Sequence, residues 1–211
     1  MEPNWAAEHL QVIRTLMERT AVYRRALAPI MALTGVIGIA AALGGLLARI
    51  DSPKGFAIYW LLVSLAAVLG ALLLVRREAL REREPFWSPP TRRVTQALLP
   101  ALSAGFILSI ILLLQGAPED VGRGLEIRRL PILWIIFYGC ALHAAGFFMP
   151  RGMKMFGWAF VFGGCALALG ITEELRPVYI YAHGIMGLFF GGFHLAYGSY
   201  LYLTEQRKNA A

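Results

Sequence analysis

Charged residues are scarce in this sequence. Only 16% of its 211 residues are Asp, Glu, Lys or Arg, whereas 58% are hydrophobic. A water-soluble domain of this length cannot hide so much apolar surface. The excess of 20 Lys and Arg over 13 Asp and Glu does not indicate nucleic-acid binding, because the basic residues stand between apolar runs and not on one polar face. The composition predicts a membrane protein whose counter-charge is anionic phospholipid.

Cysteine is nearly absent as well. Cys140 and Cys165, the only two, lie inside apolar runs, which argues against a disulfide framework. The first 25 residues contain four arginines and three glutamates, so they lack the apolar core of a cleavable signal peptide. We expect this N-terminal segment to be kept in the mature protein.

Six apolar runs are free of Asp, Glu, Lys and Arg, whose burial in hydrocarbon is costly. A bilayer core about 30 Å thick requires about 20 such residues in a helix. The predicted spans are residues 26–48, 56–75, 94–115, 130–149, 155–171 and 178–203. We predict an all-α polytopic membrane protein, a six-helix transmembrane bundle over residues 26–203 with a tail over 204–211.

Positive charge flanks these spans unevenly. Fourteen lysines and arginines fall on the side of the N-terminus, the 76–93 connection, the 151–154 connection and the C-terminus, against six on the other side. Cytoplasmic flanks carry the excess of Lys and Arg. We therefore predict that both termini are cytoplasmic.

The segment before the first span reads as an amphipathic cytoplasmic helix over residues 1–25. Five apolar residues recur at three- and four-residue spacing, namely Ala6, Leu10, Ile13, Met17 and Ala21. Such a helix lies on the membrane surface or against the bundle, or it docks a partner or a second copy. The first span follows directly, with Pro29 expected in its opening turn.

The connection between the second and third spans is rich in arginine. Its six arginines are Arg76, Arg77, Arg81, Arg83, Arg92 and Arg93. Three glutamates accompany them, so a solvated interfacial loop explains the pattern, and binding of anionic lipid head groups on the cytoplasmic side is the sharper alternative.

The last span carries a stripe of small and polar residues. His183, Gly187, Gly191, His194 and Gly198 share one face of an α-helix. Glycines on a stripe let another helix approach closely, and a buried imidazole can form a hydrogen bond across that contact. We predict a helix-packing seam at these five residues.

His143 is the other histidine that invites a cofactor hypothesis. At 1.5 Å per residue, its estimated depth in the membrane is similar to that of His194. Two imidazoles on separate helices could ligate a haem b. A weaker option joins Cys140, His143 and Cys165 around Cu(I) or Zn²⁺. Three histidines in a membrane protein of this size are common by chance, and no CxxC or HExxH spacing supports the second set. The predicted cofactor is therefore none, with haem b as the alternative.

Residues for catalysis are lacking. Glu119-Asp120 and Glu173-Glu174 fall in predicted connections without a histidine, a serine or a metal cluster at a spacing that would tune an acid or a base. A phosphate-binding loop and a nucleophile elbow are both absent. The sequence leans toward a non-enzymatic protein.

A repeated turn suggests two related halves. Pro53-Lys54-Gly55 and Pro150-Arg151-Gly152 open the second and fifth spans. Halves of three helices each would be inverted in the membrane, as in many transporters. Pro and Gly around a cation are also ordinary hairpin chemistry, so this alternative stays open.

Short motifs at both ends resemble one family. Glu8-His9-Leu10, Ile13-Arg14 and Met17-Glu18-Arg19, together with GGFHLAYG over residues 191–198, are similar to a group of small, uncharacterised bacterial six-span membrane proteins. The resemblance implies a six-helix fold in the bacterial inner membrane and singles out His194 as the polar position to test. It implies no activity.

Three functional hypotheses follow. The leading one is a non-enzymatic accessory, regulatory or scaffold subunit that forms a homo-oligomer or binds a protein partner through its glycine-rich last helix. The second is a small-solute transporter or channel built on the inverted repeat. The third is a haem b electron-transfer protein that uses His143 and His194.

Overall fold

The computed structural model of this chain describes the backbone of residues 5–81, 83, 85–114, 129–149, 151–170 and 178–209. Side chains are described for the same residues except 5–25, 151, 178–180 and 205–209. Every element in these ranges is helical, which confirms the all-α class. The carboxylates predicted at Glu119-Asp120 and Glu173-Glu174 lie outside the described residues.

Six helical rods make up the described chain. They are α1 (Trp5–Leu47), α2 (Pro53–Arg81), α3 (Pro89–Leu114), α5 (Leu130–Ala145), α6 (Arg151–Gly170) and a last rod made of α7 (Val178–Met186), η1 (Gly187–Phe193) and α8 (His194–Asn209). We call this sixth rod the last helix. Each predicted span overlies one of the six rods.

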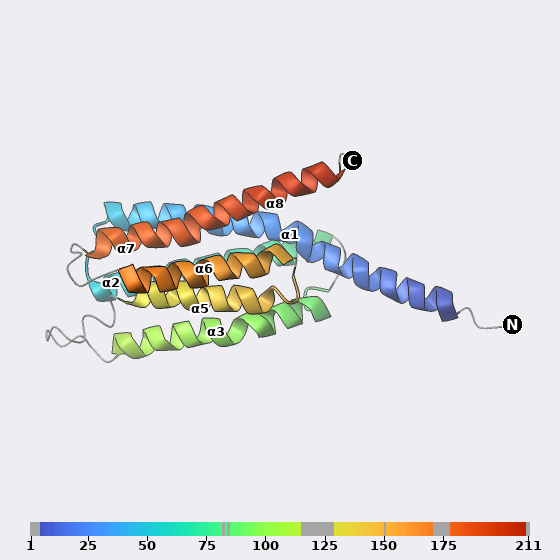
Figure 1. The fold of residues 1–211 in the computed structure, drawn as a ribbon, viewed down its shortest axis with the longest axis horizontal. Helices are drawn as coiled ribbons and strands as arrows, with labels where there is room; N and C mark the ends of the chain where they lie inside the picture. The colour runs from blue at the N-terminus through green and yellow to red at the C-terminus, as the bar shows by residue number, and fades with distance from the viewer. Residues whose placement is uncertain are drawn as a thin grey trace.

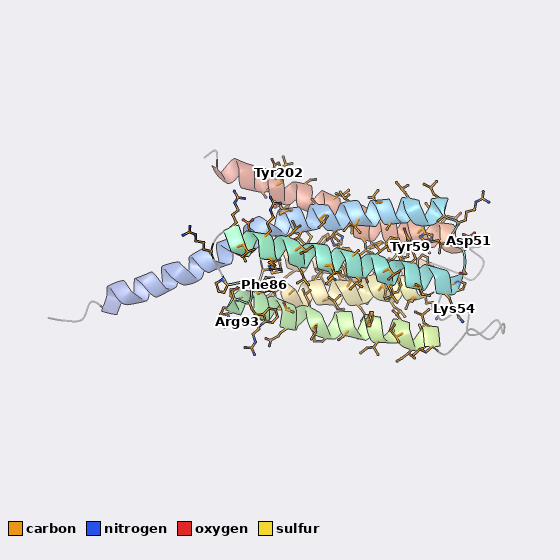
Figure 2. All side chains as sticks on the ribbon, turned by 180° about the vertical axis from the view of Figure 1, so that it is seen from behind. Asp51, Lys54, Tyr59, Phe86, Arg93 and Tyr202 are labelled. Carbon is orange, nitrogen blue, oxygen red and sulfur yellow. The ribbon has the colours of Figure 1, made fainter. Side chains whose placement is uncertain are left out.

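The rods lie side by side along the long axis of the molecule (Figure 1). The turn between α1 and α2 lies at one end of the bundle, which we call the turn end, near the labelled Asp51 and Lys54 (Figure 2). The beginning of α3 and the end of α8 lie at the opposite end, the tail end, near the labelled Phe86, Arg93 and Tyr202 (Figure 2). The arginine-rich connection and the C-terminal tail therefore share one end of the bundle.

Among the described residues, four helical stretches are long and apolar enough to cross a membrane, namely 26–47 of α1, all of α2, all of α3 and 152–170 of α6. Helix α5 is apolar but has only 16 residues, and Pro131 stands at its start, where its missing N–H leaves no bond unmade. On α2, Leu62 and Leu73 expose 61% and 64% of their surface. Apolar surface on this scale is typical of a protein that faces lipid.

Helix α1 is longer than the sequence predicted. It runs without a break for 43 residues, so Pro29 lies inside the helix and not in its opening turn. Its N-terminal part extends beyond the other helices at the tail end (Figure 1). We call the segment 5–25 the arm. The amphipathic character predicted for the arm concerns side chains outside the described part, and it stays a prediction.

Glycines bring two pairs of helices into backbone contact. A Cβ on Gly38 of α1 would lie 2.5 Å from the carbonyl carbon and oxygen of Phe190 in the last helix. A Cβ on Gly139 of α5 would lie 2.8 Å from the carbonyl oxygen of Gly157 in α6. Without a hydrophobic force between helices in lipid, such close approach supplies much of the packing energy.

Gly38→Ala is expected to destabilise the bundle, because the added methyl group must push α1 away from the last helix. Overpacking of this kind costs about 1–3 kcal/mol. Gly184→Ala on the last helix is the matched control, since nothing lies within 4 Å of its Cβ position, and loss of a helical glycine stabilises by up to about 1 kcal/mol. Unfolding in mixed micelles measures both. Equal effects of the two substitutions would contradict this packing.

Candidate functional site

The last helix changes its winding near the middle. Between α7 and α8, the seven residues of η1 form a π-helix. Its hydrogen bonds span five residues where those of an α-helix span four, so it holds more residues per turn. Relative to a continuous α-helix, the residues that follow the π segment are therefore rotated backward about the helix axis.

One side of the last helix packs against α1. Gly187 has Ala42 of α1 at 2.6 Å from its Cβ position, and Gly191 has the backbone nitrogen of Ile39 at 2.9 Å. Gly198 likewise faces the backbone of Ala32 at 3.0 Å. The three predicted seam glycines thus all face α1.

His194 lies on another side of the same rod. It is fully buried, and its ring is surrounded by aromatic side chains from α5, α6 and η1. These ring contacts are Tyr138, Phe156, Phe160 and Phe190. Tyr138 Oη lies 2.7 Å from His194 Nε2, and Phe189 O lies 3.2 Å from His194 Nδ1.

These two partners fix the protonation of the His194 ring. The Phe189 carbonyl can only accept a hydrogen bond, so Nδ1 must carry the proton. In a neutral ring Nε2 then accepts the hydrogen bond that the Tyr138 hydroxyl donates. His194 is thus a fully bonded, neutral link between the last helix and α5.

His183 forms a second buried link, near the turn end, with the opposite tautomer. The Trp60 indole N–H can only donate, and it lies 3.1 Å from His183 Nδ1. His183 Nε2 carries the proton and donates to the carbonyl of Ile50 at 3.2 Å. Gly45 of α1 makes room for the ring, because a Cβ at that position would overlap it.

The predicted seam is therefore divided between two sets of partners. His183 and the three glycines contact α1, as a single stripe requires. The placement of His194 on the same stripe is wrong, because its ring contacts α5 and α6. The stripe assumes unbroken α-helical winding, whereas the π segment of seven residues changes the angle between His194 and the glycines Gly187 and Gly191. Gly198, one turn after His194 on α8, still faces α1.

The structure does not form the proposed haem pair. His143 contacts Phe147 and Trp158, and none of its ring neighbours is shared with His194. Both ring nitrogens of His194 already bond to protein groups, so neither offers a lone pair to iron. His143 Nδ1 is buried without a hydrogen-bond partner among the described atoms.

The two thiol groups predicted as possible metal ligands lie at the surface of the bundle. Cys140 and Cys165 are both exposed on the outside of the bundle. Among the described residues, no group of three His, Cys, Asp or Glu side chains is arranged to hold a metal ion.

The six arginines proposed for lipid binding are all exposed. They lie on the last turns of α2, in the connection and on the first turns of α3, at the tail end. Phe86 and Trp87, also exposed, sit among them. Aromatic and cationic side chains together suit a lipid–water interface.

Several residues of the site were missed from the sequence. Tyr138 and Trp60, the partners of the two histidines, carry no signal in a single sequence because they lie far from them in the chain. The α1 face could have been found, since Gly35, Gly38, Ala42 and Gly45 are spaced by three, four and three residues. The same rule that identified the last helix identifies this face.

Comparisons of this chain with protein families, curated proteins and solved structures gave no significant match.

The opposite tautomers of the two histidines are directly measurable. In nitrogen-15 spectra of histidine-labelled protein in lipid bilayers at neutral pH, His194 should be protonated on Nδ1 and His183 on Nε2. His194→Gln and His183→Gln assign the signals. Finding the same tautomer at both positions would refute the hydrogen-bond assignment.

Proposed function

We propose that this chain is a non-enzymatic accessory, regulatory or scaffold protein of the bacterial inner membrane, with six spans and its tail end in the cytoplasm. The rods run in alternating directions (Figure 1), and the arginines lie at the tail end; both observations support this topology. The resemblance of both chain ends to small bacterial six-span proteins supports the location.

Three buried polar side chains support a structural role for the interior, although His143 Nδ1 and Tyr197 Oη are also buried and have no hydrogen-bond partner among the described residues. His183, His194 and Ser109 are each bonded to a group on another part of the bundle. A polar group in hydrocarbon needs such a partner, so these bonds hold helices together. A binding or catalytic site would instead present polar groups to a ligand.

The glycine seam is occupied within the chain, so it is not the surface on which a partner assembles. Helix α1 itself fills the seam. The arm is the better candidate, because it continues α1 without a break past the other helices (Figure 1). This continuous arm is the observation that carries the proposal, and we assign it the docking role.

Two added carboxylates on the apolar stripe of the arm should abolish assembly. In Ile13→Glu/Met17→Glu the stripe becomes charged, whereas Gln11→Glu/Thr15→Glu places the same charge on the opposite side and serves as the control. Cross-linking in native membranes, followed by native mass spectrometry, measures the assembly. We expect at least a tenfold loss for the first variant and little change for the second.

A full-length protein that is monomeric and free of partners in mild detergent would contradict the proposal. Equal assembly of both arm variants would also contradict it.

One packing relation favours the transporter hypothesis as a second candidate. Helix α1 packs against α2 and the last helix, and α5 packs against α6 and α3. If residues 26–114 and 130–209 are taken as halves, each first helix contacts its own second helix and the third helix of the other half. Inverted repeats related by a twofold axis have this pattern of contacts.

A water-filled path between the halves would reach Ser109, which lies between α3 and α5. Ser109 is fully buried and accepts a hydrogen bond from Trp134 Nε1 at 2.8 Å. Ser109→Cys, in a chain with Cys140→Ser and Cys165→Ser, should resist membrane-impermeant thiol reagents if the chain is a scaffold. Rapid labelling from either side would favour the transporter instead.

A further inference from the structure

The π-helix η1 lies between two fixed points of the last helix. Near the turn end, His183 ties α7 to Trp60 and to the Ile50 carbonyl. Beyond η1, His194 at the first position of α8 is tied to Tyr138 of α5. Any change in the winding of η1 must therefore rotate α8 relative to α7.

Local contacts hold η1 in its wide form. Its sequence is GLFFGGF, and three glycines give its backbone unusual freedom. On one side the backbone of Phe190 rests against Gly38 of α1. On the other side the His194 ring reaches back to the Phe189 carbonyl and outward to Tyr138. A hydrogen bond supplied by α5 thus meets the residue that directly follows the π segment.

We propose that η1 is a register switch, in which the Tyr138–His194 hydrogen bond holds the π form and its loss lets the segment wind as an α-helix. Residues of α8 would then turn by about one α-helical position, roughly 100°. His194 would leave the aromatic cluster and move toward the side of Gly187 and Gly191, and Gly198 would leave its contact with Ala32 of α1. Because α8 leads to the tail end, this rotation would carry a change in the bundle to the membrane surface there.

The wide turn favours this switch over a merely irregular helix. π-helical segments are rare, and they occur frequently at functional sites. Continuous α-helical winding would return His194 to the stripe that the sequence predicts, beside Gly187 and Gly191. The α form would therefore exchange the Tyr138 bond of His194 and the contact of Gly198 with Ala32 for a position of His194 beside Gly187 and Gly191. The switch does not depend on what binds the arm.

Spin-label distances test the switch in the full-length protein. Labels at Tyr202→Cys on α8 and Leu80→Cys on α2 report the rotation, since both side chains are exposed and both native cysteines can be replaced by serine. The parent should give one distance population. In Tyr138→Phe, a second distance population should appear beside the parental one or replace it. Its label-to-label distance should differ by several ångströms, up to about 8 Å for a rotation of one residue on a helix about 10 Å wide.

Ser109→Ala is the matched control, because it removes a buried interhelical hydrogen bond that does not involve the last helix. It should leave the distance unchanged. A folded Tyr138→Phe protein that keeps the single parental distance would overturn the proposal, and so would a Ser109→Ala protein that shifts as Tyr138→Phe does.

Deletion of Gly192 supplies an independent variant. Gly192 contacts only Leu188 of its own helix within 4 Å of its Cβ position, and removing one residue lets η1 wind as an α-helix without rotating α8. The deleted chain should keep the parental distance, and should keep it when Tyr138→Phe is added. Loss of the parental distance on deletion would overturn the switch even if Tyr138→Phe alone failed to fold.

Discussion

The backbone contact between α1 and the last helix is the constraint on which the rest of the bundle depends. Gly38 faces the Phe190 carbonyl so closely that no other side chain fits there without moving a helix. This contact places α7 where His183 meets Trp60, and it places α8 where His194 meets Tyr138. Lipid offers helices no hydrophobic reason to associate, so small residues and bonded polar groups must supply it.

His183 and His194, which have opposite tautomers, are bonded polar groups of this kind at two positions along the last helix. Each ring has one nitrogen that donates to a backbone carbonyl and one that accepts from an aromatic side chain of another helix. Bonds of this kind satisfy both nitrogens without charge, which hydrocarbon requires. They also make the histidines parts of the scaffold, and this is why the proposed function rests on the arm and not on the interior.

Much of the architecture could be predicted from apolar runs alone, because a helix that crosses a bilayer needs about 20 residues without charge. The beginnings of α5 at Leu130 and of α7 at Val178 coincide with the predicted starts of their spans. The length of α1 could not be predicted, since Pro29 fits the first turn of a helix as well as a position inside one. The predicted stripe joins His194 to Gly187, Gly191 and Gly198, whereas in the structure the glycines pack against α1 and His194 lies against α5 and α6. Periodicity assumes 3.6 residues per turn and cannot show a π segment. Tyr138 and Trp60 are brought to the histidines only by the tertiary fold.

The central claim is that the last helix changes register at η1, so that Gly187 and Gly191 meet α1 while His194, directly after the π segment, meets α5 and α6. Nitroxides at Leu195 and Ala196 test it most directly through their collision rates with dissolved oxygen, which is concentrated in lipid. In the structure Ala196 is exposed and Leu195 packs against Gly35 of α1, so the rate should be clearly higher at Ala196. Continuous α-helical winding from the exposed Leu188 would turn Leu195 toward lipid instead. A higher rate at Leu195 would contradict the account.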